Sequence, residues 1–440
     1  MPYTLTHIGG EHTVTGSCHL LQAEGLNILV DCGICQGADS ALPLDEWPVA
    51  PSAIDFLFLT HAHIDHIGRV PELIASGFSG EILCTHATKA LLSPMLEDAL
   101  SFTRMGGDER EKLLSNLEEI SWGFEYKEVF SLRRGITFTL GRAGHILGSC
   151  WIRFDLPKKE SIVFSGDLGA RNTPILPDPD IPAPCDLLVM ESTYGDRRHE
   201  ERGNRIGRLE SILEKALGDN GKVLIPAFAL GRTQELLYEL DRLFSNPKSS
   251  FSKENRHLPV FIDSPLGLAI TRIYSDLTEG WDREAKALLA NADHPLDFDH
   301  LYGVASFTDH QQLLELNGPA IIIAGSGMCS GGRIVAHLKR HLDDPATDIL
   351  FVGYQAPGTT GRDILTYAGK PGGHVMLDGE SCRIHASVHA LGGYSAHADG
   401  EELLQWAAAV RPGDVKLVHG EASAQAHLNR LIQSHLKSRP

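Results

Sequence analysis

The chain has 440 residues, 42% hydrophobic and 22% charged, which is typical of a folded globular protein too long for one ordinary core. Its formal charge of −18 argues against a surface that coats nucleic acid nonspecifically, but it is compatible with a local cationic groove. The sequence contains no apolar run of about 18 residues and no basic-then-apolar N-terminal segment. We therefore expect no membrane span, no secretory signal and a cytoplasmic location.

The eight cysteines are sparse and lie mostly in apolar stretches, so a disulfide framework is not expected. Cys32 and Cys35 form a lone C-x-x-C pair, which is found both in redox pairs and in half of a zinc site. Because no second C-x-x-C accompanies it, we interpret the pair as two packed thiols.

Short β-branched apolar runs recur along the chain, and each is followed by a polar or glycine-rich cluster. Runs of this length, bounded by turn signals, predict buried strands. Each strand would deliver its polar cluster at its carboxyl end, where layered α/β proteins place their chemistry. The first group comprises NILV before Asp31, DFLFL before Thr60, SIVF before Ser165, DLLVM before Glu191 and DVKLV before His419.

A second group of apolar runs alternates with helix-like stretches, which predicts a mainly parallel sheet covered by helices. Its clusters are rich in Gly, Ser and Arg, whereas those before residue 195 and after residue 380 are rich in His and Asp. This contrast predicts a catalytic domain in two parts, residues 1–194 and 376–440, interrupted by an α/β insertion, residues 195–375. The runs are KVLIPAFALGR, LPVFIDSP, AIIIAGSG and DILFVGYQ; the helices are Thr233–Phe244 and Gly332–Leu342; a solvated loop is expected over 245–258.

The strongest chemical signal is HAHIDH, residues 61–66, directly after the strand-like run DFLFL. Burying several imidazoles without partners would cost about 1–3 kcal/mol each, so a core role is not a sufficient explanation. In extended backbone His61 and His63 point to the same side, while a following turn can aim Asp65 and His66 elsewhere. The spacing therefore favours two neighbouring metal ions over one.

Two metals need about six or seven protein ligands. Loops after other strand-like runs supply His145, Asp167 and His419. Together with the HAHIDH residues these make five imidazoles and two carboxylates without a thiolate, a set that fits two Zn²⁺ best and is compatible with Mn²⁺ or Fe²⁺. Asp31 has two readings of equal weight: it orients a ligand or a bound water, or it merely begins a turn.

The motifs together resemble the metallo-β-lactamase superfamily, whose signature is H-x-H-x-D-H followed by His, Asp and His ligands. More narrowly they resemble its β-CASP family of nucleases, which includes prokaryotic ribonucleases and the nuclease subunit of the cleavage and polyadenylation specificity factor. The resemblance implies a metallo-β-lactamase αββα sandwich split by an inserted α/β β-CASP domain. It rests on VTGSCHLL (14–21), ILVDCGICQG (28–37), THAHIDHIGRVPEL (60–73), GHILGS (144–149), FSGDLG (164–169), ESTYGDR (191–197), PAFALGRTQELL (226–237), GSGMCSGGR (325–333), GYQAPGTTGR (353–362), GYSAHAD (393–399) and VHGE (418–421).

The resemblance also assigns roles to individual residues. Glu191 matches the acidic residue of motif A, His397 matches the histidine of motif B, and His419 matches motif C, where histidine favours RNA over DNA. For the metals, it assigns His61, His63 and His145 to one ion, Asp65, His66 and His419 to the other, and Asp167 to a bridging position.

These roles lead to the hypothesis of an endonucleolytic ribonuclease acting on single-stranded RNA. The two metals would share a bridging water that becomes hydroxide near neutral pH and attacks the phosphorus. His397, oriented by Glu191, would protonate the leaving 3′-oxygen and leave 3′-hydroxyl and 5′-phosphate ends. The catalytic residues of this hypothesis are Asp31, Asp65, Glu191 and His397.

A second hypothesis concerns phosphate recognition by the segment that follows the run AIIIAG. Backbone N–H groups at a helix start, together with a guanidinium, form an anion site, although the glycines there are equally explained by a need for positive φ. Arg232 and Arg362, each following a Gly after a strand, would line the same site. Its other members are Ser326, Ser330, Gly331, Gly332 and Arg333.

Three rival functions remain open. A DNA-directed β-CASP nuclease is disfavoured only by His419. A small-molecule hydrolase such as a thioesterase shares H-x-H-x-D-H but leaves the insertion and GSGMCSGGR unexplained. An inert scaffold is disfavoured because all seven ligands are kept. A homodimer is compatible with the sequence.

Overall fold

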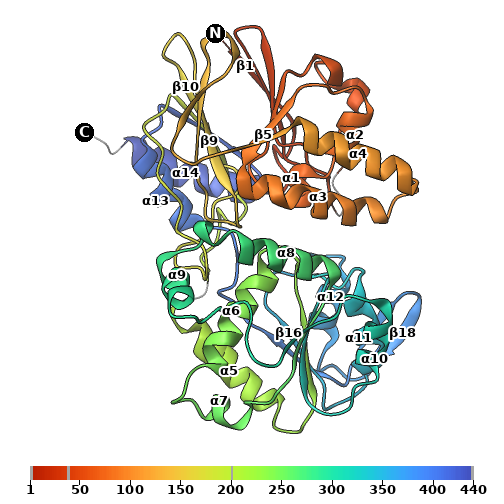
Figure 1. Cartoon of the computed structure of the whole chain (residues 1–440). Coiled ribbons are helices and arrows are strands. Elements are labelled where there is room, and N and C mark those ends of the chain that lie inside the picture. Colours follow the sequence, from red (N-terminus) through yellow and green to blue (C-terminus); the bar gives the residue numbers. More distant parts are fainter. Residues whose placement is uncertain (1–2, 37–39, 200–201, 438–440) are drawn as a thin grey trace. The chain divides into compact units, whose positions relative to one another are not determined.

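The computed structural model describes residues 3–36, 40–199 and 202–437. The chain divides into two compact units, coloured along the sequence in Figure 1. Unit 1 joins Met1–Arg198 to Ala396–Pro440, and unit 2 is His199–Ser395. None of the helices in the described ranges is long and apolar enough to cross a membrane.

Unit 1 contains two six-stranded sheets. In the first, β1 to β3 are antiparallel and β3 to β6 run parallel; in the second, β20, β11 and β10 run parallel and the remaining strands are antiparallel. The first sheet has the order β1 (Tyr3–Gly9), β2 (Cys18–Ala23), β3 (Leu26–Val30), β4 (Phe56–Phe58), β5 (Glu81–Thr85), β6 (Ser121–Phe124). The second has the order β20 (Asp414–Val418), β11 (Leu187–Glu191), β10 (Ser161–Phe164), β9 (Cys150–Asp155), β8 (Thr137–Arg142), β7 (Val129–Ser131).

The two sheets of unit 1 pack face to face and enclose its main core. At the centre, the Phe58 ring meets the edges of Phe138 and Phe154 at centroid distances of 4.9 and 4.8 Å, the edge-to-face geometry that aromatic pairs prefer. This core ties the strands that carry HAHIDH to the strands of the opposite sheet, so the ligands from both sheets are held by one packed interior.

Helices cover the outer faces of this sandwich, as Figure 1 shows for the α1–α4 group and for α13 and α14. Trp406 and Leu403 of α13 and Leu428 of α14 bury against Leu188 and Val163 of the second sheet. The αββα arrangement predicted from the resemblance is confirmed. The helices are α1 (Ile64–Ile67), α2 (Val70–Ala75), α3 (His86–Ser101), α4 (Gly107–Ile120), α13 (Gly400–Val410) and α14 (Ala422–Lys437), with 3₁₀ turns at Leu44–Glu46, Pro51–Ala53 and Arg133–Gly135.

Unit 2 is built on a six-stranded sheet in which every neighbouring pair is parallel. The mainly parallel sheet predicted for the insertion is therefore confirmed. Strand β15 is buried along its whole length, which explains its unbroken apolar run AIIIA. The order is β14 (Leu301–Gly303), β13 (Val260–Asp263), β15 (Ala320–Ala324), β12 (Lys222–Pro226), β16 (Asp348–Phe351), β19 (Ser387–Ala390), with a separate hairpin of β17 (His374–Leu377) and β18 (Glu380–Arg383).

The helices of unit 2 alternate with these strands, as the sequence predicts. The segment 245–258 differs from the expected solvated loop, because it contains α7 and its Phe251 side chain is fully buried. The Phe251 ring lies 5.6 Å from the ring of Phe244, and Leu258 at the end of the segment is also buried. The helices are α5 (Arg205–Ala216), α6 (Arg232–Phe244), α7 (Ser250–Glu254), α8 (Pro265–Asp276), α9 (Arg283–Ala290), α10 (Phe307–Leu314), α11 (Arg333–His341) and α12 (Thr360–Tyr367), with 3₁₀ turns at Arg202–Asn204 and Thr278–Gly280.

The return from unit 2 to unit 1 lies after residue 395, whereas the sequence suggests a boundary after residue 375. The reason is that the hairpin and β19 belong to unit 2. Leu377 and Ile384 are buried in its core, and β19 pairs with β16. The two ends of unit 2 also meet, because the Arg202 guanidinium donates to the Ser395 carbonyl at 3.0 Å.

We predict that residues 199–395 expressed alone fold cooperatively, while residues 195–375 alone do not. The shorter fragment loses the edge strand β19 and the apolar side chains that the hairpin contributes to the core. Circular dichroism during urea titration is the measurement. A cooperative transition of the 195–375 fragment equal to that of 199–395 would contradict the structural boundary.

Candidate metal centre

The carboxyl ends of strands from both sheets of unit 1 carry the candidate residues. Asp31 follows β3, and HAHIDH follows β4 and runs into α1; on the other sheet Asp167 follows β10, Glu191 ends β11, and His419 follows β20. In the parallel pair β11–β20, Glu191 lies opposite Val418, so Glu191 and His419 leave the same edge of the sheet. Segments far apart in the sequence thus meet at one end of the sandwich.

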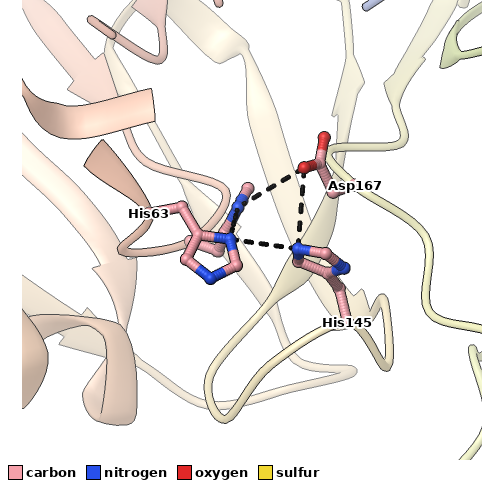
Figure 2. Close-up of side chains that lie close together, drawn as sticks. His63, His145 and Asp167 are labelled. Atoms are coloured by element: carbon pink, nitrogen blue, oxygen red, sulfur yellow. Dashed lines mark hydrogen bonds and ion pairs between the residues drawn. The ribbon is translucent and has the colours of Figure 1, made fainter. Parts of the chain in front are cut away.

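The first cluster consists of His61, His63, His145 and Asp167 (Figure 2). His63 Nδ1 lies 3.1 Å from both His61 Nε2 and His145 Nε2, and Asp167 Oδ2 lies 3.6 Å from each of those two Nε2 atoms. Metal–nitrogen bonds of about 2.0–2.1 Å directed to tetrahedral corners would place ligand atoms about 3.3–3.4 Å apart. The observed spacing therefore fits four ligands around one cation.

The second cluster consists of Asp65, His66 and His419 and adjoins the other oxygen of Asp167. Asp167 Oδ1 lies 3.4 Å from His66 Nε2 and 3.5 Å from His419 Nδ1, and Asp65 Oδ2 lies 3.5 Å from His419 Nε2. His66 Nε2, His419 Nε2 and Asp167 Oδ1 are buried atoms without a hydrogen-bond partner. Buried polar atoms are rarely left unpaired, so unpaired atoms within this cluster, with His66 Nε2 and Asp167 Oδ1 3.4 Å apart, fit a bound cation.

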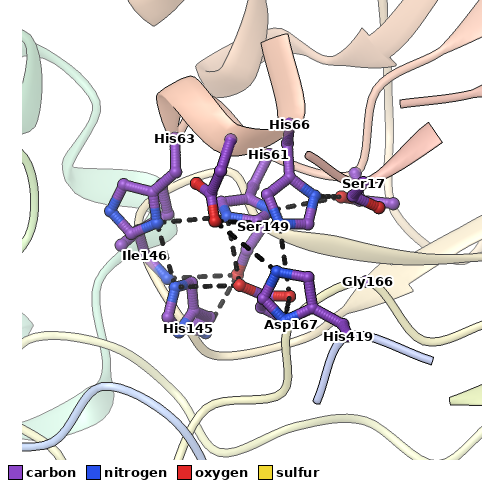
Figure 3. A network of polar contacts seen from close by, with 12 residues as sticks. Ser17, His61, His63, His66, His145, Ile146, Ser149, Gly166, Asp167 and His419 are labelled. Atoms are coloured by element: carbon purple, nitrogen blue, oxygen red, sulfur yellow. Dashed lines mark hydrogen bonds and ion pairs between the residues drawn. The ribbon is translucent and has the colours of Figure 1, made fainter. Parts of the chain in front are cut away.

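Asp167 faces both clusters through different oxygens (Figure 3). The donors are imidazole nitrogens and carboxylate oxygens, a set that suits divalent transition metals and Zn²⁺ in particular. The structure thus brings together all seven residues that the sequence proposes as metal ligands.

Asp31 holds one of these imidazoles in place. Its Oδ2 lies 2.7 Å from His66 Nδ1, and its Oδ1 accepts the Thr60 backbone N–H at 2.8 Å. The Thr60 hydroxyl donates to Asp31 Oδ2 at 2.9 Å and lies 3.1 Å from His61 Nδ1. Of the two readings of Asp31, the structure matches the one in which it orients a ligand, because its contact aims His66 Nε2 toward Asp167.

A tight turn between β8 and β9 places His145. The Ser149 hydroxyl oxygen accepts the backbone N–H of His145 at 2.9 Å, and Gly144 and Gly148 adopt positive φ values of 72° and 85°. A side chain at Gly148 would collide with the backbone of Thr88 in α3. The GHILGS sequence is therefore required by the shape of the loop that carries the ligand.

Burial and neighbouring charge divide the imidazoles into two groups. Burial lowers the pKa of His61 and His145, and lowers that of His63 to about 4, which keeps these rings neutral as metal binding requires. Burial opposes charge on His66 and His419 as well, but the neighbouring carboxylates, Asp167 and Asp65 for both and also Asp31 for His66, together raise their pKa. In return, although burial opposes its charge, His419 and His66 lower the pKa of Asp167.

Glu191 and His397 form a pair beside the first cluster. His397 Nδ1 lies 3.2 Å from Glu191 Oε2, and Glu191 Oε1 accepts the Leu168 backbone N–H at 2.6 Å. An isolated β-bridge between Gly169 and His397 fixes the backbone of the histidine. Burial would lower the pKa of His397, but the charge of Glu191 and its hydrogen bond raise it to about 9. The contact with Glu191 thus favours the protonated form of the ring.

The residues expected to bind phosphate lie in unit 2, and two of them have other partners there. The Arg333 guanidinium donates to Asp263 Oδ1 at 2.7 Å and to the carbonyls of Val304 and Ala305 at 2.8 Å each. Arg232 pairs with Glu235 in the next turn of α6. Each of these guanidinium groups thus has a carboxylate partner within the chain, and phosphate binding by the two arginines stays a prediction.

The remaining phosphate candidates differ from these arginines. Arg362 is exposed in the first turn of α12. Ser326 donates its backbone N–H to the Gly331 carbonyl and its hydroxyl oxygen accepts the Ser330 N–H at 3.1 Å. Gly332, the residue before α11, adopts a φ of 75°. For Gly332 the explanation from backbone conformation therefore has direct support, whereas phosphate binding at this turn stays a prediction.

The structure contains a buried cluster of polar side chains that the sequence analysis does not predict. Asp263 Oδ2, at the end of β13, lies 2.5 Å from His310 Nδ1 and 2.6 Å from His337 Nε2. These distances are too short for two ligands of one cation and match direct hydrogen bonds. In the sequence, Asp263 is marked only by its position at the end of a predicted strand. Its histidine partners come from α10 and α11, which no local pattern connects to that strand. The cluster is a junction that ties β13, α10 and α11 together.

Three family models match the chain. The metallo-beta-lactamase superfamily matches residues 13–227, the Beta-Casp domain matches 233–364, and the Zn-dependent metallo-hydrolase RNA specificity domain matches 381–439. Ribonuclease TTHA0252 of Thermus thermophilus is 38% identical over 96% of this chain and 94% of its own length. The chain belongs to the β-CASP family of the metallo-β-lactamase superfamily. It is thus a metallo-β-lactamase-fold hydrolase, and the fold implies a divalent metal cofactor.

Other relatives of this β-CASP enzyme come from eukaryotes and archaea. Cleavage and polyadenylation specificity factor 73 of Drosophila melanogaster is 29% identical over 97% of this chain and 61% of its own length. Transcription termination factor FttA of Methanocaldococcus jannaschii is 29% identical over 95% of this chain and 67% of its own length. A solved structure of a protein of unknown function from Enterococcus faecalis shares the fold, with a TM-score of 0.57 and 13% identity over 95% of this chain and 94% of that one.

We predict that Asp263→Asn destabilises the β-CASP unit by about 3–5 kcal/mol near neutral pH, because Arg333 loses its buried partner. Burial would raise the pKa of Asp263, but hydrogen bonds from His337, Arg333 and His310 lower it. Its stabilising effect is thus present above the unfolded pKa of about 3.9 and is lost as pH falls toward the lower folded value.

Urea unfolding at several pH values, with hydrogen exchange reporting on β13 and α11, is the measurement. The difference between parent and Asp263→Asn should shrink below about pH 4. The exposed Asp299→Asn in the same unit is the matched control and should change little. A difference that stays constant down to pH 2 would show that the Asp263 charge is not what stabilises the junction.

Proposed function

We propose that this β-CASP enzyme is an endoribonuclease that hydrolyses phosphodiester bonds of single-stranded RNA and leaves 3′-hydroxyl and 5′-phosphate ends. The observation that carries the proposal is the pair of adjoining donor clusters with the His397–Glu191 pair beside them. Relatives named ribonuclease or endoribonuclease support RNA as the substrate. His419, the motif C residue, also favours RNA over DNA.

We assign one Zn²⁺ to His61, His63, His145 and Asp167, and a second Zn²⁺ to Asp65, His66, His419 and the other oxygen of Asp167. Mn²⁺ and Fe²⁺ suit the same donors. Metals held by these residues would lower the pKa of a bound water and neutralise negative charge on a phosphoryl group. Asp65 is the most exposed of the carboxylates here, with 19% of its side chain accessible, and is thus placed to orient the attacking water as well.

The chain's own contribution to bond breaking is a proton for the leaving 3′-oxygen. The ring of His397 is held at Nδ1 by Glu191, and Glu191 is held by the backbone of Leu168. A proton at Nε2 of that oriented ring is the one delivered to the leaving oxygen. Asp31 acts indirectly. It contacts His66 and Thr60 directly and holds them in the geometry that the donor clusters need.

The decisive experiment is incubation of the purified enzyme with end-labelled single-stranded RNA, with and without a chelator. We expect internal cuts, loss of cleavage with chelator and recovery with Zn²⁺ or Mn²⁺. DNA of the same sequence and a chromogenic thioester, assayed in parallel, test the two rival functions. Equal cleavage of DNA, or thioester hydrolysis without RNA cleavage, would overturn the proposal.

We predict that His397→Ala lowers kcat for RNA cleavage by about 10²–10⁴ while the metal content stays that of the parent. The physical reason is that the variant removes a proton donor and leaves the donor clusters intact. Metal analysis by mass spectrometry and single-turnover kinetics give the two readouts.

The exposed His427→Ala in α14 is the matched control and should keep both activity and metal. If His397→Ala loses metal in proportion to activity, the residue is a ligand and the proposed role is wrong. An RNA with a better leaving group than a ribose 3′-oxygen should partly restore cleavage by His397→Ala, which a purely structural defect would not allow.

A further inference from the structure

Unit 2 contains a cleft of about 490 Å³ next to the hairpin β17–β18, whose second strand is labelled in Figure 1. Its walls are the turn 370–373, the outer face of the hairpin and residues 384–385. The Gly373 N–H donates to the Lys370 carbonyl, the Ile384 N–H donates to the Gly373 carbonyl, both at 3.0 Å, and the His385 N–H donates to the Leu342 carbonyl at 2.9 Å. The backbone around the cleft is therefore fixed.

The hairpin presents two different faces. Val375 and Leu377 point into the core of unit 2 and are buried. His374 lies directly opposite Arg383 on the exposed face. The Arg383 guanidinium is a permanent cation, and the His374 ring opposite it offers an anion a further ring nitrogen.

The charges around the cleft have one sign. Lys370 and Arg383 are permanent cations, His374 and His385 add imidazoles, and no carboxylate is among the residues that line the cleft. The hairpin's own Glu380 is engaged by Lys339 on α11 at 2.5 Å. Of the lining side chains, His385 lies 2.8 Å from the exposed Asp343. In a chain with a formal charge of −18, such a cleft is unusual.

We propose that this cleft binds phosphate groups of the RNA backbone, as a site that holds the substrate away from the bond being cut. Lys370 and Arg383 would contact phosphate oxygens, and the Ser381 hydroxyl, also in the lining, would donate a hydrogen bond. The proposal rests on the proposed ribonuclease function and names a further substrate contact.

The cleft is separate from the turn first expected to hold phosphate. Ile384 and His385 come just before β19, whereas Ser326–Gly332 follow β15. In a sheet whose strands are all parallel, the amino ends of the strands lie along one side and the carboxyl ends along the opposite side. The two sides are about 13–17 Å apart for strands of four or five residues. The cleft therefore lies at the amino ends of the strands of unit 2, and the turn 326–332 lies at their carboxyl ends.

The test is the double variant Lys370→Glu/Arg383→Glu in the full chain. We expect its affinity for a long single-stranded RNA to fall about tenfold or more, and the slope of log K against log salt to fall by about 1.4, the value for two lost phosphate contacts. On an RNA of only a few nucleotides kcat should match the parent. The variant Lys370→Arg/Arg383→Lys, which keeps both charges, should keep the affinity.

Lys253→Glu/Arg256→Glu has the same charge change at exposed positions of unit 2 and is the matched control. Equal affinity and salt slope for the cleft variant, the control and the parent would overturn the proposal. Inorganic phosphate or a mononucleotide that binds the cleft as tightly as RNA would also overturn it in favour of a small-ligand site. Binding is measured separately from cleavage. If the enzyme fails to cut RNA, the proposed function is wrong, but the binding experiment still tests whether the cleft holds RNA.

Discussion

The Asp167 carboxylate is the contact on which the whole centre depends. One of its oxygens faces the His61, His63 and His145 cluster, and the other faces the His66 and His419 cluster. HAHIDH comes from the first sheet of the sandwich, while Asp167 and His419 come from the second. The two half-sites meet only when the apolar core between the sheets is formed. The chemistry of the enzyme is therefore conditional on the packing of Phe58 against Phe138 and Phe154.

The same arrangement lowers the stability of the metal-free fold, and a bound cation would offset this loss. Several imidazoles and a carboxylate are buried, and His66 Nε2, His419 Nε2 and Asp167 Oδ1 have no hydrogen-bond partner. Burying polar atoms in that way is unfavourable in the folded chain alone. A ligand that binds only the folded state stabilises it by mass action. Cofactor binding and folding of unit 1 are thus coupled through the same atoms.

Much of this organisation was accessible from the sequence, because several signals are local. The apolar runs before Asp31, Thr60 and Glu191 predict strands correctly, and HAHIDH concentrates four donor groups in six residues. His145, Asp167 and His419 are single residues in loops, and each becomes a ligand candidate only because HAHIDH alone supplies too few ligands for two metals. Their convergence depends on strand order in two sheets, which no local pattern specifies.

The sequence was less informative where a residue finds a partner inside the protein. Arg333 has the features of an anion-binding arginine, and it does bind a carboxylate, that of Asp263, 70 residues away in the chain. Sequence alone does not distinguish an internal anion from an external one. The boundary at residue 395 was missed for a related reason, because the polar hairpin hides Leu377 and Ile384 among exposed residues.

The pairing of β11 with β20 spans the whole inserted unit, since Glu191 lies beside Val418. Chains emerge from the ribosome amino end first, and domains generally fold as units in that order. The first sheet of unit 1 and all of unit 2 can form before β20 has been translated. The strand that precedes His419 is made only after the whole inserted unit, so a nascent chain that stops before β20 lacks a complete centre. An enzyme built in this way can acquire its activity only after its inserted unit has been translated.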